Sequence, residues 1–241
     1  MLCRRYLDTS RGEHLRGQQA RRGGRAGRNG AIGRADLKVS VGKTEVLFFR
    51  QKKSPPPPQD ANIKVSGCSV PVKPEIKYLG LILDGHWSFE GHVSEVARRV
   101  RESKFATRTF PNLGGPSGGA RRLYVNTVRA IALYAAPVWA DALAANRRSR
   151  VKLESAFHPV AVGASRAYRT VSRAAAAVLA GIIPADLLAL EYARTFRRLR
   201  AIRENRGTVT PAARSRVRLE HRADTVVQWS RRLRDPGDGA P

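Results

Sequence analysis

Acidic side chains are the first place to look for chemistry, because carboxylates hold catalytic metal ions and act as general acids and bases. The nine aspartates stand at positions 8, 36, 60, 84, 141, 186, 224, 235 and 238, and no two of them are adjacent. The closest acidic pairs, Asp235/Asp238 and Glu220/Asp224, fall in a charged stretch where a solvated face is the expected role. The sequence therefore predicts no carboxylate metal site.

Sequence patterns for other kinds of reaction are also missing. The chain contains no H-E-x-x-H and no paired Cys and His spacing for zinc. Gly42-Lys43-Thr44 ends like a phosphate-binding P-loop, but Leu37 stands where the first glycine is required and a β-rich segment follows. The five histidines are scattered, and we expect them to be exposed or capping residues.

Arginine is the residue type whose number and spacing indicate a partner. The chain carries 45 Lys and Arg against 19 Asp and Glu, a formal charge of +26 over 241 residues. A guanidinium fork matches phosphate oxygens, so helices loaded with arginine favour a sequence-independent RNA or DNA backbone as the partner. Solvated faces of an Arg-rich chain would give the same pattern. The groups are Arg98/Arg99/Arg101/Lys104/Arg108, Arg121/Arg122, Arg147/Arg148/Arg150 and Arg194/Arg197/Arg198/Arg200/Arg203.

Membrane and secreted proteins fit the sequence poorly. The longest uncharged apolar run, about 130–140, is interrupted by Pro137 and is too short to span a bilayer. The first residues have no apolar stretch behind them, so no signal peptide is predicted. Two cysteines, Cys3 and Cys68, cannot frame a disulfide-rich module. We expect an intracellular protein, nuclear or cytoplasmic, without membrane insertion.

The first part of the chain predicts a leader and a small β region. Arg and Gly dominate residues 1–36, so we expect disorder there, either as a nucleic-acid arm or as read-through of GC-rich DNA. Lys43–Phe49 predicts a buried strand, and the proline run from Ser54 predicts a spacer or loop. Strands around Gly67-Cys68-Ser69 predict a hairpin, and the apolar run within Lys77–Asp84 predicts one strand covered on both faces.

After Asp84 the apolar spacing becomes helical. Ser88 is the expected N-cap of the first helix, and Pro137 is expected to break the chain after the second. Pro159 weakens the third helix. Within the second helix we expect Leu123, Tyr124, Thr127, Val128, Ile131 and Leu133 to be largely buried. The predicted helices cover 92–108, 120–134, 147–165, 172–181, a segment from Pro184, and 210–234.

Five segments, in order, resemble the reverse transcriptases of non-LTR (LINE-type) retrotransposons, most closely the arthropod elements that insert into ribosomal RNA genes. Leu37–Phe49 is similar to their "KTE-x-h-x-F" stretch, and Lys77–Asp84 to "KYLG-x-x-LD". The next matches are Trp87-Ser88-Phe89-x-x-His92, Leu133-Tyr134-x-x-Pro137-Val138-Trp139, and Arg166–Ser172 followed by Leu179-Ala180-Gly181-x-x-Pro184. Together they cover about two-thirds of the chain.

The resemblance implies an α+β fold in which the edge of a polymerase palm leads into a helical thumb. It places a disordered leader at 1–36, palm-edge strands with a primer-grip-like hairpin at 37–86, a helical thumb at 87–206, and a basic helix and tail at 207–241. Lys77 and Tyr78 would approach the primer strand, with a core aromatic as the alternative for Tyr78. The residues expected to approach phosphates are Arg98, Arg99, Arg101, Arg121 and Arg122. Trp139 and Tyr134 are expected in the core.

The family holds Mg²⁺ with an early Asp and an aromatic-x-Asp-Asp turn, and this sequence contains neither arrangement. The two-metal mechanism needs carboxylates that bind both ions. We therefore expect a fragment without metal or other cofactor that is inactive as an RNA-directed DNA polymerase by itself and binds nucleic-acid duplex. The alternatives are a non-catalytic module that binds protein or membrane, and a pseudogene product without function.

Overall fold

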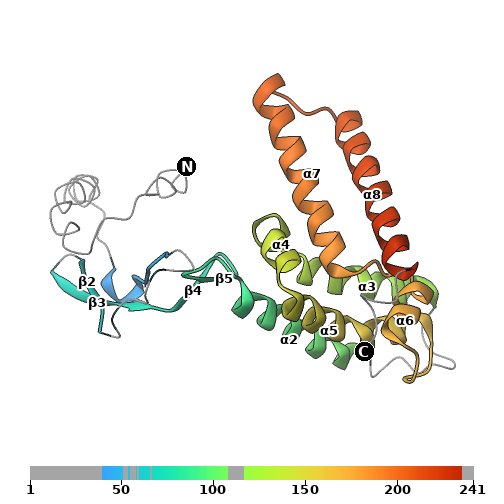
Figure 1. The fold of residues 1–241 in the computed structure, drawn as a ribbon, viewed down its shortest axis with the longest axis horizontal. Coiled ribbons are helices and arrows are strands. Elements are labelled where there is room, and N and C mark those ends of the chain that lie inside the picture. Colours follow the sequence, from blue (N-terminus) through green and yellow to red (C-terminus); the bar gives the residue numbers. More distant parts are fainter. Residues whose placement is uncertain are drawn as a thin grey trace. The chain divides into compact units, whose positions relative to one another are not determined.

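The computed structural model describes residues 40–50, 54, 58, 60–65, 67–107 and 117–234 (Figure 1). The predicted leader at 1–36 lies outside these residues, as does most of the proline run. The chain divides into two compact units, one of Met1–Phe48 with Pro55–Lys73 and one of Phe49–Ser54 with Pro74–Pro241. The predicted α+β class is confirmed, because short strands come first and seven α-helices follow in the described residues.

The first unit contains a three-stranded sheet. β2 (Asn62–Val65) pairs antiparallel with β3 (Cys68–Lys73), and β1 (Val46–Leu47) runs parallel to β3 on its other side. The register joins Val65 to Cys68, so the predicted hairpin forms, but Cys68 and Ser69 belong to β3 and the turn precedes them. The expected buried strand over 43–49 is wrong. A 3-10 turn, η2 (Val41–Lys43), precedes a strand of only two residues, and Phe48 and Phe49 are exposed.

The second unit begins with a hairpin, as the resemblance implied within 37–86, in place of the single strand that the apolar run alone predicted for Lys77–Asp84. β4 (Glu75–Tyr78) pairs antiparallel with β5 (Leu81–Asp84) around a two-residue turn of Leu79 and Gly80. Both turn residues have positive φ, +47° and +85°, which is the geometry of a type I′ turn. A continuous apolar run cannot reveal such a turn, because Leu is not a residue that favours positive φ.

Asp84 joins this hairpin to the first helix, α2 (Glu90–Thr107). One carboxylate oxygen accepts the backbone N–H groups of His86 and Ser88, and the other accepts that of Phe89 at 2.7 Å. Burial raises the pKa of Asp84, but these bonds outweigh it, and the pKa is lower than normal. The carboxylate thus satisfies amides in front of the helix, while the hydroxyl of Ser88, the expected N-cap, accepts the N–H of Glu90 at 3.4 Å.

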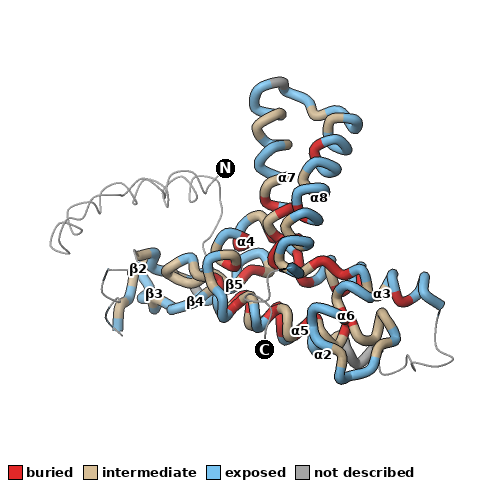
Figure 2. The backbone as a smooth tube through the Cα atoms, turned by 45° about the vertical axis from the view of Figure 1, so that its right-hand side comes forward, coloured by how far each residue is buried: buried red, intermediate tan, exposed pale blue. Residues whose placement is uncertain are grey.

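The core of this unit lies between α2, α3 (Gly118–Ala132), α4 (Ala136–Ala145) and α5 (Arg147–Ser165). Figure 2 shows buried positions along these helices. Trp139 on α4 is 1% exposed, and its indole N–H donates to the Tyr134 carbonyl at 3.0 Å. Trp139 is therefore a core residue, as expected.

Pro137 starts α4 rather than only ending the preceding helix. Proline suits the first turn of a helix because its missing N–H has no partner to lose there. Ala135, at φ +52°, makes the corner between α3 and α4. Pro159 lies inside α5, which continues unbroken to Ser165. The predicted range 147–165 is therefore confirmed.

The burial expected along α3 is partly wrong. Val128 and Leu133 are buried, but Leu123, Thr127 and Ile131 are exposed. Arg121 and Val125 occupy buried positions instead. Tyr134 was expected in the core and is exposed.

Two long helices complete the unit after α6 (Arg173–Leu179), which Ser172 caps by accepting the Ala175 N–H. α7 (Ala185–Arg206) and α8 (Pro211–Arg234) lie side by side as a helical hairpin (Figure 1). Arg232, at the end of α8, donates to both carboxylate oxygens of buried Asp186 at 3.1 and 2.7 Å. This pair fixes the last turn of α8 to the first turn of α7.

No single helix in the described part of the chain is long and apolar enough to cross a membrane; α3 and α4 pass together by length and composition, with an 85° bend between them.

His92, on α2, connects the hairpin to the helical core. Its Nδ1 accepts the Ile82 N–H at 3.4 Å, and its ring lies 5.8 Å from that of Trp139. Its Nε2 is buried without a partner among the described residues. Burial, with a smaller contribution from Arg99, lowers the pKa of His92 from 6.5 to about 4. The imidazole is therefore neutral in the folded protein.

This environment predicts an acid-sensitive fold. Between pH 6.5 and about 4 the unfolded chain binds a proton at His92 that the folded chain does not. The free energy of unfolding should therefore decrease as the pH falls through this range, by about 1.4 kcal/mol per pH unit from this group. Urea unfolding followed by circular dichroism should show a shallower decrease for His92→Asn. An unchanged pH dependence in that variant would contradict this assignment.

Candidate nucleic-acid interface

The end of the β4–β5 hairpin presents the first two predicted site residues. Lys77 and Tyr78 are the last residues of β4, and both are exposed, Tyr78 by 59%. The alternative that Tyr78 belongs to the core is wrong. An exposed aromatic ring beside a cation can stack on a base or sugar while the cation meets a phosphate.

The turn that holds these two residues is strained and supported from one side. Leu79 adopts the left-handed conformation although it has a branched apolar side chain, which is 73% exposed. The Tyr134 hydroxyl donates to the Leu79 carbonyl at 3.1 Å. A Cβ on Gly80 would lie 3.3 Å from the Tyr134 ring, so only glycine fits without displacing that ring. Strain maintained at an exposed position is a feature of functional sites.

The arginines of α2 differ in their availability. Arg98 bridges Glu95 and Glu102, and Arg99 pairs with Glu95 at 3.0 Å. Hydrogen bonds from Arg98, and then from Arg99, lower the pKa of Glu95 to about 2. These two arginines are therefore largely neutralised by their own helix. Arg101 is exposed and forms no ion pair within the described residues.

The two arginines at the start of α3 are not equivalent. Arg122 is exposed, whereas Arg121 is 2% exposed and donates to the Gly163 carbonyl on α5. Arg121 was predicted to approach phosphates, and its burial contradicts that role. Its guanidinium instead crosslinks two helices of the core, a distinction that adjacent arginines do not reveal in a sequence.

The predicted site residues do not form one cluster. Arg122 is the fifth residue of α3, while Tyr134, which supports the β4–β5 turn, lies just beyond the other end of that helix. A helix of 15 residues is about 22 Å long, so these features lie at opposite ends of α3. One turn of duplex is about 34 Å, so a single duplex could contact both.

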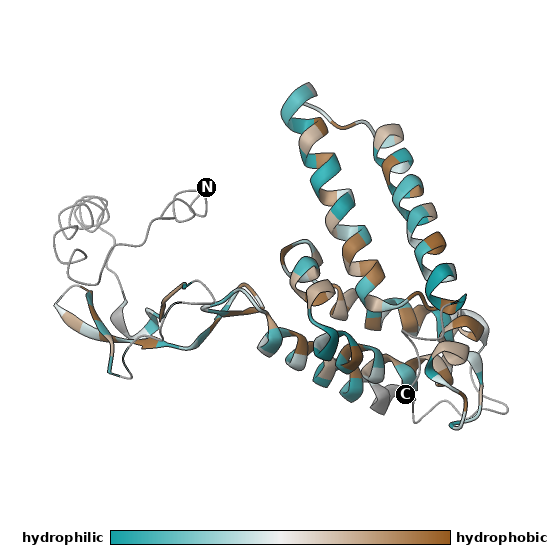
Figure 3. Ribbon diagram, viewed as in Figure 1, coloured by the Kyte–Doolittle hydropathy of each residue, from teal (hydrophilic) through white to brown (hydrophobic). Residues whose placement is uncertain are grey.

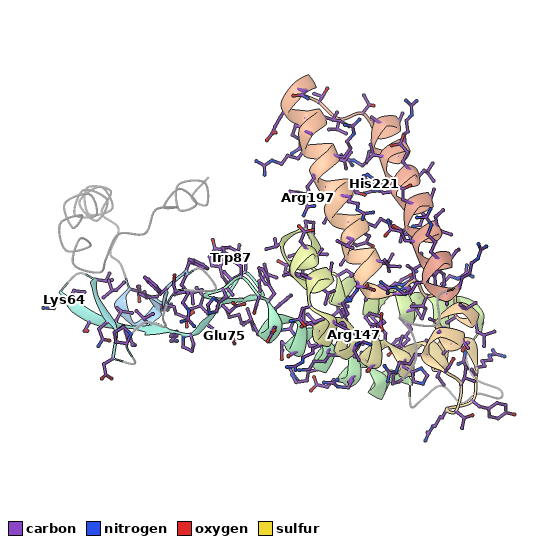
Figure 4. The ribbon with its side chains drawn as sticks, viewed as in Figure 1. Lys64, Glu75, Trp87, Arg147, Arg197 and His221 are labelled. Carbon is purple, nitrogen blue, oxygen red and sulfur yellow. The ribbon has the colours of Figure 1, made fainter. Side chains whose placement is uncertain are left out.

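Other exposed basic residues extend the surface beyond the predicted set. A hollow of about 570 Å³ is lined by Arg147, Arg148, Val151 and Lys152 at the start of α5, where Figure 4 labels Arg147. The loop between α5 and α6 exposes Arg169 and Tyr168, the latter by 81%. Sequence reasoning assigned no role to Tyr168, although an aromatic between arginines is a recognisable signal.

Acidic side chains do not gather into a metal site in the described residues, where no group of three or more His, Cys, Asp or Glu could hold an ion. Seven of the twelve carboxylates that the structure describes in the second unit are instead engaged by arginine. The paired ones are Glu95, Glu102, Asp141, Glu154, Asp186, Glu191 and Glu204. The exposed surface is consequently richer in unpaired cations than in unpaired anions.

Comparison with known proteins gives no independent assignment. No protein-family model matches the chain, and neither a curated protein nor a solved structure is similar to it.

The contrast between Arg121 and Arg122 can be tested by substitution. Arg121→Met should lower the free energy of unfolding by about 2 kcal/mol, because it removes the hydrogen bond that the buried Arg121 side chain donates to the Gly163 carbonyl. Arg122→Gln should change it by no more than about 0.5 kcal/mol, because the side chain is exposed. Urea unfolding of both variants makes the comparison. Equal stabilities of the two variants would contradict the different roles.

Proposed function

We propose that this chain is the palm-edge and thumb part of a non-LTR retrotransposon reverse transcriptase, and that it binds nucleic-acid duplex through phosphate contacts. The observation that carries the proposal is the excess of exposed, unpaired cations on the helical unit. Lys77, Arg101 and Arg122 belong to this excess, while Arg98 and Arg99 are engaged by glutamates.

The order of elements supports the family. The "KYLG-x-x-LD" segment forms the β4–β5 hairpin, and the segment from Trp87 to His92 connects it to α2. Strands that lead into a helical bundle are the order that a palm followed by a thumb requires. In this proposal Lys77 and Tyr78 touch the primer strand.

The proposed binding is sequence-independent. Exposed arginines on several helices suit a phosphate backbone, which every sequence shares, and phosphate contacts position a protein without reading bases. Among the site residues predicted from the sequence, Arg101 and Arg122 are the principal phosphate ligands. Arg98 and Arg99 can contribute only by exchanging their glutamate partners, and Arg121 is assigned to the core.

Catalysis by the chain alone is not part of the proposal. Nucleotidyl transfer by two metal ions needs closely spaced carboxylates, and the sequence has no adjacent aspartates. The activity of an intact polymerase would depend on a palm that supplies them. The chain's own contribution is to grip the duplex.

Salt dependence provides the test of this function. The chain should bind an RNA–DNA hybrid at ~50 mM salt, and log K should fall linearly with log salt, because each neutralised phosphate releases counterions. In the variant Arg101→Gln/Arg122→Gln the slope should be smaller in magnitude by about 2, one for each lost contact. Fluorescence anisotropy measures both quantities.

A charge-matched control is available in the first unit. Lys43→Gln/Lys64→Gln removes the same charge from two exposed residues outside the proposed site. This control should keep the wild-type slope. The function is refuted if the wild-type chain does not bind the hybrid at ~50 mM salt. Equal losses in both variants would instead place the contacts elsewhere.

A further inference from the structure

The α7–α8 hairpin continues past its last attachment to the rest of the helical unit. Arg197 on α7 pairs with Asp141 on α4, and within the described residues no later residue of α7 bonds to another helix of the bundle. Two residues before Arg197, α7 and α8 hold each other through Thr195 and His221, whose side chains lie 3.0 Å apart. Figure 4 labels Arg197 and His221 on these two helices. We call residues 198–218 the distal hairpin.

The distal hairpin has little apolar interior. Val217 is its one buried residue among those whose burial is described, with Leu199 and Ile202 half-buried beside it. Figure 3 shows hydrophilic colouring mixed with hydrophobic positions where α7 ends and α8 begins. Hydrophobic burial therefore does not explain why the chain maintains two long helices here.

Charge is the dominant feature of this segment. Seven arginines stand against one acid, Glu204, which pairs with Arg200 at 2.9 Å. The other five arginines whose side chains are described are exposed and form no ion pair within the described residues: Arg198, Arg203, Arg214, Arg216 and Arg218. Such a concentration of like charge is unfavourable for the folded protein unless an anion neutralises it.

The arrangement of these arginines distinguishes between anionic partners. Arg198 and Arg203 are five residues apart, which places them about 140° apart around α7. Arg216 and Arg218 are about 160° apart around α8 by the same geometry. A helix that binds a membrane surface needs one apolar face opposite its basic face. Cations on both faces fit a nucleic-acid backbone better than a flat lipid surface.

The width of the hairpin determines the kind of contact. Two packed helices are about 20 Å across, wider than the major groove of about 12 Å. The hairpin cannot insert as a unit and read base edges. Its arginines can reach the phosphates along the rim of a groove.

We propose that the distal hairpin is a second, separate nucleic-acid-binding site that grips the phosphate backbone of a duplex with Arg198, Arg203, Arg214, Arg216 and Arg218. This inference rests on the proposed function, because it takes the same class of partner. It adds a site that is remote in sequence from Lys77, Arg101 and Arg122. Two linked sites on one chain would raise the affinity for a duplex long enough to reach both.

The full chain allows a direct test with a mixed-sequence DNA duplex. The variant Arg198→Gln/Arg203→Gln/Arg218→Gln should reduce the magnitude of the salt slope by about 3 and raise Kd about tenfold or more at ~200 mM salt. The matched control, Lys43→Gln/Lys64→Gln/Arg234→Gln, removes equal charge from exposed residues outside the hairpin and outside the candidate interface, and should cause a smaller change. Circular dichroism should show unchanged helix content in both variants.

Each result decides the proposal. If the wild-type chain binds the duplex and the hairpin variant loses no more affinity than the control variant, the hairpin site is overturned and the proposed function stays intact. Absence of wild-type binding overturns both. Loss of binding to phosphatidylserine vesicles with unchanged duplex binding would assign the hairpin to a membrane and also overturn the proposal.

Discussion

Ion pairs between arginine and carboxylate determine which arginine charges are neutralised within the protein and which remain available on its surface. Asp186 is almost fully buried, and its carboxylate accepts hydrogen bonds from both terminal nitrogens of Arg232, near the end of α8. Glu154 lies beside the same arginine, and burial together with Asp186 raises the pKa of Glu154. Removing one partner from such a cluster would leave an uncompensated buried charge. Because carboxylates are used in this way, the arginines left on the surface have few anions to neutralise them.

The β4–β5 hairpin depends on a different set of contacts. Asp84 fixes its base to α2 through three backbone amides, and His92 receives the Ile82 N–H from β5. Tyr134 holds the other end by bonding to Leu79. A hairpin that is held both at its base and at its strained, exposed turn is preorganised for a partner, so binding need not supply the energy to order it.

Sequence reasoning succeeded where local patterns determine the structure. α5 was predicted with its observed bounds, and in the structure Asn146 caps it and Pro159 does not break it. The helix predicted to begin at Ser172 does begin there, with Ser172 as its N-cap. Reasoning failed where tertiary contacts decide. The buried Arg121 side chain donates to the carbonyl of Gly163, 42 residues away in the sequence, and no local pattern encodes that contact. The apolar run alone missed the turn at Leu79, because that side chain gives no turn signal, whereas the resemblance implied a hairpin in this region.

The central claim is that the folded helical unit, with its exposed cations, holds the nucleic acid. The most direct measurement is photo-crosslinking of the full chain to a bound RNA–DNA hybrid, followed by identification of the crosslinked peptides. The account predicts crosslinks in the β4–β5 hairpin, in α2 and α3 near Arg101 and Arg122, and in the α7–α8 hairpin. Crosslinks confined to the Arg/Gly-rich residues 1–36 would contradict it, because binding would then need none of the folded surface.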